Sequence, residues 1–343
     1  MNIASIVGTR PQFLKLAALD SYVQKNNSFN HFIVHSGQHF DKNMSEVFFD
    51  QLDITPPHLL IERNQSSNIQ NLSHIMIEFE KFILLHDINT VLVYGDCDTT
   101  LAGALVANKL NIGLVHIESG MRSYNKNMPE ENNRVLTDHL SDFLFCPDAT
   151  AVQNLKKELI KKNVFISGNL QIELSKNILE KNPLPQKFYN YALLTIHRHY
   201  NTNVDFLQKT FDSLAKLNQV FMFPVHPRTK HIIQENSIKV PSNIYMNDPF
   251  DYLEMLQMLL HCDYVITDSG GLQLESWYHK KRCIVMRSET EWIAPIESNN
   301  SILYNYKEDL SNFILNFLDK KVTDEYNLPL NTSELIIDAL LNQ

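Results

Sequence analysis

The sequence predicts an α/β protein made of two open domains, each built on a parallel sheet. Short runs of β-branched and aromatic residues alternate with longer amphipathic segments along the whole chain. This alternation is typical of parallel strands that helices cover on both faces. The pattern starts again after Gly168, and 343 residues suffice for about two domains, each with its own core. We therefore expect two α/β domains with a cleft between them.

In the first half of the chain, amphipathic segments indicate helices at Phe13–Gln24, Ile69–His86 and Glu130–Leu140. Apolar runs between these segments have the length and composition of buried strands. We expect the strands at Asn2–Val7, His31–Val34, Thr90–Val93, Leu114–Ile117, Phe143–Phe145 and Val164–Ile166.

The second half follows a polar, proline-containing break at Asn182–Lys187. The segment Ser333–Asn342 is expected to form a terminal helix that packs back on the first domain. We place the domains at residues 1–170 and 171–330, followed by the terminal helix at 331–343. The strands of the second domain are expected at Ala192–Ile196, Val220–Phe223, Asn243–Met246, Tyr264–Thr267 and Cys283–Val285.

Charge and composition exclude several classes of partner. Thirty basic against 39 acidic side chains give a net charge of −9, which argues against a nucleic-acid-binding surface. No run approaches the roughly 20 apolar residues of a membrane span, and the N-terminus does not resemble a signal peptide. The four cysteines form no CxxC pair and are expected to be buried free thiols. These features predict a soluble cytoplasmic protein without nucleic-acid or membrane partners.

In open α/β sheets, ligands bind beyond the carboxyl ends of the strands, so polar residues there are the candidates for function. The first predicted strand is followed by the motif GTRPQ, which places Arg10 at the mouth of a helix and Lys15 one turn further on. A capped surface helix with a solvated arginine accounts for this segment equally well.

Carboxylates follow two neighbouring strands of the same domain. Asp96 and Glu118 end adjacent predicted strands and should lie close together, as proton transfer requires. For either acid alone, a capping or salt-bridge role is equally plausible. Glu130 lies in the first turn of the next helix, where it suits the helix dipole, and it is spaced for an ordinary ion pair with Arg134.

The second domain carries residues suited to an anionic ligand. His197 and His226 each stand at a predicted strand end with an arginine close behind in the sequence. Ser269, Gly270 and Gly271 lie between a strand and a helix, where free amides and the helix dipole can bind phosphate. A structural Gly-Gly turn is the alternative. Glu275 lies further along that helix, placed to accept hydrogen bonds from a ribose. No spacing resembles a zinc site, so no metal is predicted.

Taken in order, these segments closely resemble the non-hydrolysing UDP-N-acetylglucosamine 2-epimerases. The resemblance runs from Gly8 to Ser276, through GTRPQFLK, SGQH, YGDCDTTLAGA, HIESGMRS, MPEENNRVLTDHLSD, HRHYN, HPR and TDSGGLQLES. It implies two Rossmann-like domains of the GT-B type, usually a homodimer, with substrate in the interdomain cleft and no organic cofactor.

The resemblance also implies roles for individual residues. The acid/base residues would be Asp96, Glu118 and Glu130, with His197 as a further catalytic residue. The contacts to UDP and its phosphates would be Arg10, Lys15, Arg134, His226, Ser269, Gly270, Gly271 and Glu275.

The implied reaction is inversion at carbon 2 of a UDP-activated N-acetylated amino sugar. The carbon-2 proton has no adjacent carbonyl, so departure of UDP must first make it acidic. Arg10, His197 and the Ser269–Gly271 helix start would stabilise the leaving pyrophosphate while one acid takes the proton. Which acid acts as base stays open.

Some residues depart from the usual family pattern. Trp292 stands where many members carry arginine, and Gln12 replaces a glutamate; both forms resemble the branch that acts on UDP-2,3-diacetamido-2,3-dideoxyglucuronic acid. Phe40-Asp41 replace residues that follow Gln38-His39 in members activated by a second substrate molecule. The uronate is therefore the alternative substrate. A hydrolysing 2-epimerase and a non-catalytic nucleotide-sugar-binding protein are further alternatives.

Overall fold

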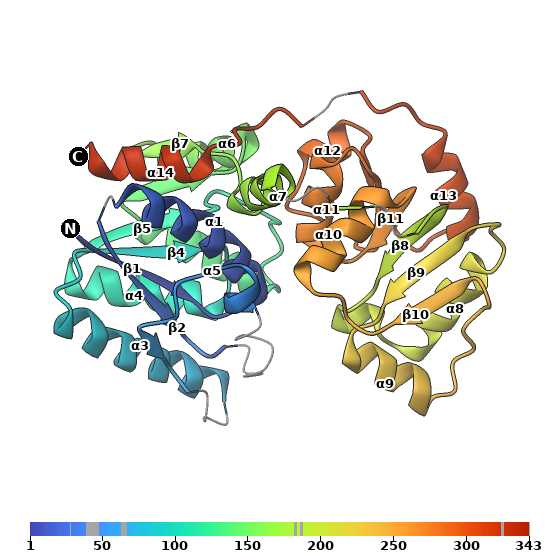
Figure 1. Cartoon of the computed structure of the whole chain (residues 1–343), viewed down its shortest axis with the longest axis horizontal. Coiled ribbons are helices and arrows are strands. Elements are labelled where there is room, and N and C mark those ends of the chain that lie inside the picture. The colour runs from blue at the N-terminus through green and yellow to red at the C-terminus, as the bar shows by residue number, and fades with distance from the viewer. Residues whose placement is uncertain are drawn as a thin grey trace. The chain divides into compact units, whose positions relative to one another are not determined.

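The computed structural model describes residues 1–27, 29–38, 48–62, 67–181, 184–185, 188–323 and 326–342. The chain forms two compact units (Figure 1). Most of unit 1 is coloured from blue to green and its C-terminal segment is red, whereas unit 2 runs from green through yellow to orange-red. Unit 1 comprises Met1–Ile178 together with Leu328–Gln343, and unit 2 comprises Leu179–Asn327.

Within the described residues, unit 1 is built on a parallel sheet of seven strands in the order β3-β2-β1-β4-β5-β6-β7. The strands are β1 (Asn2–Val7), β2 (Asn30–His35), β3 (Leu59–Leu60), β4 (Thr90–Tyr94), β5 (Gly113–Ile117), β6 (Phe143–Cys146) and β7 (Val164–Ile166). The helices are α1 (Arg10–Asn26), α3 (Asn68–Leu85), α4 (Asp98–Leu110), α5 (Pro129–Leu140), α6 (Ala149–Lys157), α7 (Leu170–Lys181) and α14 (Thr332–Leu341). The order around β1 is that of a doubly wound sheet.

Helices cover both faces of this sheet, with α3 and α4 on one face and α1 with α14 on the other (Figure 1). Close packing of α4 depends on Gly103. A Cβ placed on Gly103 would lie 2.7 Å from Cγ2 of Ile6 and 2.8 Å from Cγ1 of Val93. Only glycine therefore allows the backbone of α4 to approach the sheet this closely.

The terminal helix α14 belongs to unit 1. The Thr332 hydroxyl donates to the Ser167 carbonyl at 2.7 Å, and the Ser333 amide donates to the Glu173 carboxylate at 2.7 Å. Burial raises the pKa of Glu173, although its hydrogen bonds to Ser333 act in the opposite direction. These contacts hold the end of the chain against the segment that follows β7.

Unit 2 is built on a second parallel sheet, of six strands in the order β10-β9-β8-β11-β12-β13 among its described residues. The strands are β8 (Tyr191–Thr195), β9 (Val220–Pro224), β10 (Ile244–Asn247), β11 (Tyr264–Thr267), β12 (Arg282–Val285) and β13 (Ser301–Leu303). The helical segments are η1 (His199–Asn201), α8 (Val204–Leu214), α9 (Pro227–Glu235), α10 (Tyr252–His261), α11 (Gly270–Tyr278), α12 (Ala294–Glu297) and α13 (Leu310–Leu318).

Strand β8 shows how this sheet is buried on both faces. Ala192 and Leu194 point into a cluster completed by α8 and α13, whereas Tyr191 and Leu193 point into one completed by α10 and α11. Successive side chains of a strand point to opposite faces, so an unbroken apolar run is what a doubly covered strand needs. The predicted α/β fold class with two parallel sheets is confirmed.

The structure differs from the sequence-based expectations at short elements and at boundaries. The short edge strands β3 and β13 were not predicted. The units divide between Ile178 and Leu179, whereas the predicted boundary lay at residue 170, because α7 begins at Leu170 and buries its first turns in unit 1. Residues 182, 183, 186 and 187 of the expected break lie outside the described residues. In the described part of the chain, no helix is long and apolar enough to cross a membrane.

Candidate active site

Parallel strands end at one edge of a sheet, and the loops after β1, β4 and β5 bring several predicted residues together there. The Lys15 ammonium, from α1, donates to Oε1 of Glu118 at 2.7 Å. The other oxygen of Glu118 accepts from the Asn169 amide at 2.8 Å. Both charged side chains are largely buried, so the pair is more strongly coupled than a surface ion pair. Asn169, which directly precedes α7, was not predicted.

Asp96 makes the second charged pair at this edge. Its Oδ2 accepts from Nη2 of Arg134 at 2.6 Å and from Nε at 3.1 Å. Nη1 of the same guanidinium donates to Glu131 at 2.5 Å. Arg134 therefore joins the loop after β4 to α5.

The partner of Arg134 within α5 is Glu131, and the expected pair of Arg134 with Glu130 is not formed. Glu131 is buried and also accepts from the amides of Ser123 and Tyr124. Burial acts to raise the pKa of Glu131, but those hydrogen bonds and Arg134 outweigh it and hold the pKa below its usual value. The half-buried Glu130 has no hydrogen bond to any described residue, and its helical spacing places it on the same face as Arg134. Its carboxylate is thus not committed to a structural contact.

The two charged pairs lie next to each other. A Cβ placed on Gly95, the residue before Asp96, would lie 3.5 Å from Nζ of Lys15 and 3.6 Å from Oε1 of Glu118. Gly95 has a φ of 63°, a conformation that glycine adopts without strain. Glu118 itself has a φ of 69°, which costs a non-glycine residue roughly 1 kcal/mol or more. Such a conformation persists only where surrounding contacts impose it, and it occurs preferentially at functional sites.

The start of α1 is held by Gln12. Its side-chain oxygen accepts from the Gly8 amide at 2.7 Å, and its nitrogen donates to the Tyr94 carbonyl at 2.9 Å. A glutamate cannot make the second bond, which accounts physically for glutamine at this departure from the family pattern. Arg10 begins α1 with its guanidinium 5.4 Å from the ring centre of Phe48.

In unit 2, His197 is oriented by a buried carboxylate that was not predicted. Nδ1 of His197 lies 2.9 Å from Oδ1 of Asp268, whose side chain is fully buried. Asp268 also accepts from the amides of His197 and Arg198 and from the Asn201 side chain. Burial acts to raise the pKa of Asp268, but these hydrogen bonds outweigh it and lower the pKa. Asp268 therefore fixes both the loop and the ring, whose Nδ1 faces this carboxylate.

The segment after Asp268 begins α11. The Ser269 hydroxyl caps the helix by accepting from the Leu272 amide at 3.3 Å. The amides of Gly270 and Gly271 are at the helix start, where no intrahelical acceptor exists, and both residues are partly exposed. This arrangement can bind an anion such as a phosphate.

Trp292 lies at the same helix start. A Cβ on Gly270 would lie 2.8 Å from Oε1 of Glu291, 3.4 Å from Nη1 of Arg287 and 3.5 Å from Nε1 of Trp292. The buried Arg287 donates to Glu291 at 2.8 Å. The residue that departs from the family pattern thus lines the candidate phosphate site.

The remaining predicted residues of unit 2 have structural contacts of their own. Oε1 of Glu275 accepts from the Tyr252 hydroxyl at 2.8 Å, and Glu275 is nearly fully buried. His226 is exposed and caps α9, with its Nδ1 accepting from the Arg228 amide at 3.2 Å. Arg228 in turn donates to the His197 carbonyl, which ties the loops after β8 and β9 together.

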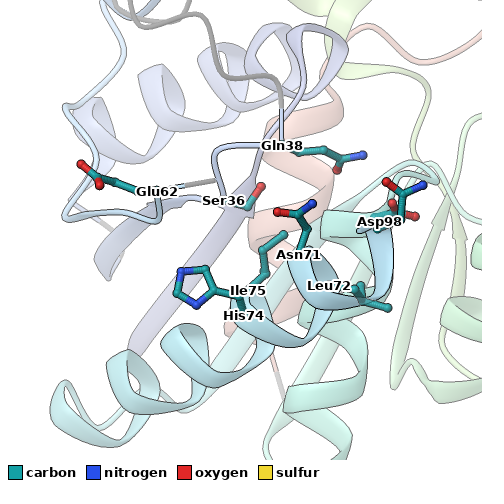
Figure 2. Close-up of a pocket in the computed structure, with 9 residues that line it drawn as sticks. Ser36, Gln38, Glu62, Asn71, Leu72, His74, Ile75 and Asp98 are labelled. Carbon is teal, nitrogen blue, oxygen red and sulfur yellow. The ribbon is translucent and has the colours of Figure 1, made fainter. Parts of the chain in front are cut away.

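Unit 1 also contains a cavity of about 210 Å³ between the loop that follows β2 and the first turns of α3 (Figure 2). Asp98 and Gln38 line it, and Oε1 of Gln38 accepts from the Thr99 amide at 3.1 Å. None of the predicted catalytic or UDP-binding residues lines this cavity. His39, Phe40 and Asp41 lie outside the described residues, so the structure does not test the departure from the family pattern at Phe40-Asp41.

The two parallel α/β units define a two-domain Rossmann-like protein of the GT-B type. The first unit carries neighbouring carboxylates, and the second carries a helix start suited to phosphate. The model of the family "UDP-N-acetylglucosamine 2-epimerase" matches residues 21–340. The chain belongs to this family, which is a family of isomerases.

Similar proteins extend over the whole chain. A UDP-N-acetylglucosamine 2-epimerase homologue of Methanococcus maripaludis is 35% identical and is covered completely, as is this chain. A UDP-2,3-diacetamido-2,3-dideoxy-D-glucuronate 2-epimerase of Pseudomonas aeruginosa is 36% identical, with 90% of each chain covered. The crystal structure of Methanocaldococcus jannaschii UDP-GlcNAc 2-epimerase in complex with UDP-GlcNAc and UDP has a TM-score of 0.88 at 34% identity, with both chains covered completely.

Proposed function

We propose that this protein interconverts UDP-N-acetylglucosamine and UDP-N-acetylmannosamine by eliminating UDP and adding it back. The observation that carries the proposal is the pair of neighbouring ion pairs, Asp96 with Arg134 and Glu118 with Lys15, at one edge of the first sheet. Two carboxylates next to each other, together with the uncommitted Glu130, supply the acid/base groups that inversion at carbon 2 needs.

The elimination step breaks two bonds and forms two, the O–H bond of the protonated carboxylate and a carbon–carbon double bond. A carboxylate among Asp96, Glu118 and Glu130 takes the carbon-2 proton, and the electrons of that C–H bond form a carbon–carbon double bond. The bond from carbon 1 to oxygen breaks, and its electron pair leaves with UDP. Re-addition of UDP with protonation on the opposite face of carbon 2 reverses each change and gives the epimer.

Cationic groups and helix amides stabilise the charge that develops on departing UDP. We assign His197, held by Asp268, and the amides of Gly270 and Gly271 to the pyrophosphate oxygens. The other proposed contacts to the substrate and its nucleotide come from Arg10, Lys15, Arg134, His226, Ser269 and Glu275. Turnover is proposed to need no metal or organic cofactor, because every proton transfer is served by a side chain of the protein.

Turnover in deuterated water tests the reaction. Incubation with UDP-N-acetylglucosamine should give UDP-N-acetylmannosamine, with deuterium at carbon 2 of both sugars as seen by nuclear magnetic resonance. Product that lacks deuterium at carbon 2 would contradict the elimination scheme. Release of free N-acetylmannosamine would indicate a hydrolysing enzyme, and binding without conversion or exchange would indicate a nucleotide-sugar-binding protein.

A second substrate, the UDP-linked diacetamido-uronate, is supported by the position of Trp292 at the Gly270 helix start. The relative named for that substrate is as similar to this chain as the relatives named for UDP-N-acetylglucosamine. Comparison of kcat/KM for the two UDP-sugars distinguishes these substrates. A preference for the uronate of tenfold or more would replace the first proposal.

We also propose that the protein is a homodimer. The helix α3 exposes apolar side chains spaced along one face, namely Ile69, Ile77 and Leu84, which are 79%, 51% and 64% exposed. A row of this kind loses contact with water when a second copy covers it.

The location and the pathway are proposals as well. All four cysteines are free, as is usual in a reducing compartment such as the cytoplasm. A UDP-linked amino sugar is an activated glycosyl donor, so reactions that build polysaccharide are proposed to consume the product.

A further inference from the structure

A buried charged network lies beneath the two loops that carry Asp96 and Glu118. His116, on β5, and Asp138, on α5, are both fully buried, and Nδ1 of the histidine lies 2.6 Å from Oδ1 of the aspartate. The other oxygen of Asp138 accepts from Nη1 of Arg122 at 2.6 Å. Strand β5 lies beside β4 in the sheet (Figure 1), and His116 is the next-to-last residue of β5, so it lies near the ends of both strands.

The network bonds to the backbone of each loop. Nε2 of His116 lies 2.8 Å from the carbonyl oxygen of Gly95, the residue before Asp96. The Gly120 amide, two residues after Glu118, donates to the Asp138 carboxylate at 3.1 Å. The pair of His116 and Asp138 therefore holds the backbone just before Asp96 and just after Glu118.

Both ring nitrogens of His116 face oxygen atoms that accept hydrogen bonds. A backbone carbonyl cannot donate, and neither can an ionised carboxylate. In either neutral tautomer, one nitrogen lone pair would point at an oxygen lone pair across a distance of 2.8 Å or less. That contact would be repulsive in a buried site with low dielectric.

Asp138 is held as the carboxylate. Burial acts to raise its pKa, but the charges and hydrogen bonds of His116 and Arg122 outweigh burial and lower the pKa. Arg122 also binds Glu158 through two hydrogen bonds, of 2.7 and 2.8 Å. With His116 charged, the four groups comprise two cations and two anions. With His116 neutral, Arg122 would be the one cation shared by two carboxylates, so the network around the fully buried Asp138 would lack one positive charge, which is costly.

Two further groups lie beside this network. The Cys146 thiol, from β6, lies 3.5 Å from the Ser119 hydroxyl, and burial raises its pKa to about 12, so it stays neutral. His139, from α5, lies 3.4 Å from Glu158 on the outer side of the network and is half exposed.

We propose that His116 is an imidazolium at neutral pH and acts as a positioning residue, donating from both nitrogens to hold the Asp96 and Glu118 loops in register. This inference rests on the proposed epimerase function for its catalytic consequence, but its protonation state is independent of that function. An uncharged side chain at position 116 can form a hydrogen bond with one of these partners, but it cannot supply the positive charge of the imidazolium.

Nuclear magnetic resonance on the full-length protein labelled with ¹⁵N-histidine tests the protonation state. At pH 7.5, one of the 14 histidines should have both nitrogens at the chemical shift of the protonated form, and this signal should be absent in His116→Gln. The Asp138→Asn variant, which removes the negative partner, should shift the signal toward the neutral form and provides the assignment if His116→Gln does not fold. A neutral tautomer for His116 in the unaltered protein would overturn the proposal.

Kinetics test the positioning role, with His31 as a matched control. His31 is buried in the same sheet beside Asp20, but its Nε2 faces the Ser5 hydroxyl, which can donate or accept, and it touches neither loop. His116→Gln should lower kcat for epimerisation by about 100-fold with little change in KM, because misplaced acids slow the chemistry more than they weaken binding. His31→Gln should change kcat less than threefold.

Equal losses of kcat in the two variants, or a loss confined to KM, would overturn the positioning role. If the unaltered protein neither epimerises nor exchanges the carbon-2 proton, the proposed function fails. The resonance experiment then still decides the charge of His116.

Discussion

Asp268 shows how much the chemistry at one residue, His197, depends on a buried neighbour. Its carboxylate fixes the His197 ring and three further donors from the loop after β8. A carboxylate at Nδ1 sets which nitrogen of the imidazole is protonated and favours its charged form when an anion leaves.

We expect Asp268→Asn to lower kcat at least about tenfold, because the amide cannot stabilise a charged imidazole and offers one acceptor where Asp268 offers two. Epimerisation measured by nuclear magnetic resonance provides the rate. The control is Asp248→Asn, an exposed carboxylate paired with Lys230, which should leave kcat unchanged. Equal rates for Asp268→Asn and the unaltered protein would show that His197 needs no such support.

The buried carboxylates also predict a pH dependence of stability. The pKa values of Asp20, Asp138 and Asp268 are lowered in the folded protein, because their hydrogen bonds and charged neighbours outweigh burial. The unfolded chain therefore binds protons first as the pH falls. The resulting stability is fully present above the unfolded pKa of about 4 and is lost as the pH falls through the lower folded values.

Urea unfolding between pH 7 and pH 2 measures this dependence. The free energy of unfolding should fall below about pH 4, and Asp138→Asn should be less stable at pH 7 but flatter below pH 4. The exposed Asp205→Asn variant should follow the unaltered protein. If the free energy of unfolding falls as steeply below pH 4 in Asp138→Asn as in the unaltered protein, Asp138 does not contribute to the pH dependence of stability.

At the scale of elements, the approach of α4 to the first sheet decides where Asp98 and the Asp96 loop lie. The contact of Gly103 with Ile6 and Val93 leaves no room for a methyl group. We expect Gly103→Ala to lower the free energy of unfolding by about 1–3 kcal/mol, despite the better helix propensity of alanine, because the clash involves two fully buried side chains.

The free energy comes from urea unfolding, with Asn108→Ala on the exposed side of α4 as the control. That control should change stability by less than about 0.5 kcal/mol. A gain in stability for Gly103→Ala would mean that the sheet accommodates the methyl group and that the glycine serves no packing purpose.

At the scale of the whole molecule, the proposed dimer is expected to form through the exposed apolar face of α3. We expect the unaltered protein to have about twice the 39.8 kDa mass of the chain by light scattering after size exclusion. A variant that combines Ile77→Glu and Leu84→Glu should be a monomer, because an unpaired carboxylate buried in the interface is strongly unfavourable. Leu315→Glu, at an exposed apolar position of α13 in unit 2, is the control and should stay dimeric. A monomeric unaltered protein, or a doubly charged variant that stays dimeric, would contradict this interface.

The sequence by itself determined the α/β class, most strands and the polar residues that follow them. These features are local, since apolar runs, helical periods and glycine turns are encoded within a few neighbouring residues. The motifs around Asp96, Glu118 and Ser269 are therefore recognisable from the order of residues alone.

Only the tertiary structure decided which side chains are partners. Glu118 is held by Lys15, from α1, and by Asn169, beyond β7; His197 is held by Asp268, which follows β11. Arg134 pairs with Glu131 and Asp96, where spacing alone had suggested Glu130. Such pairs join segments far apart in the chain, and neither the periodicity nor the charge of either segment specifies the other. Their geometry arises only when the sheet places the strand ends side by side and excludes water from the charges between them.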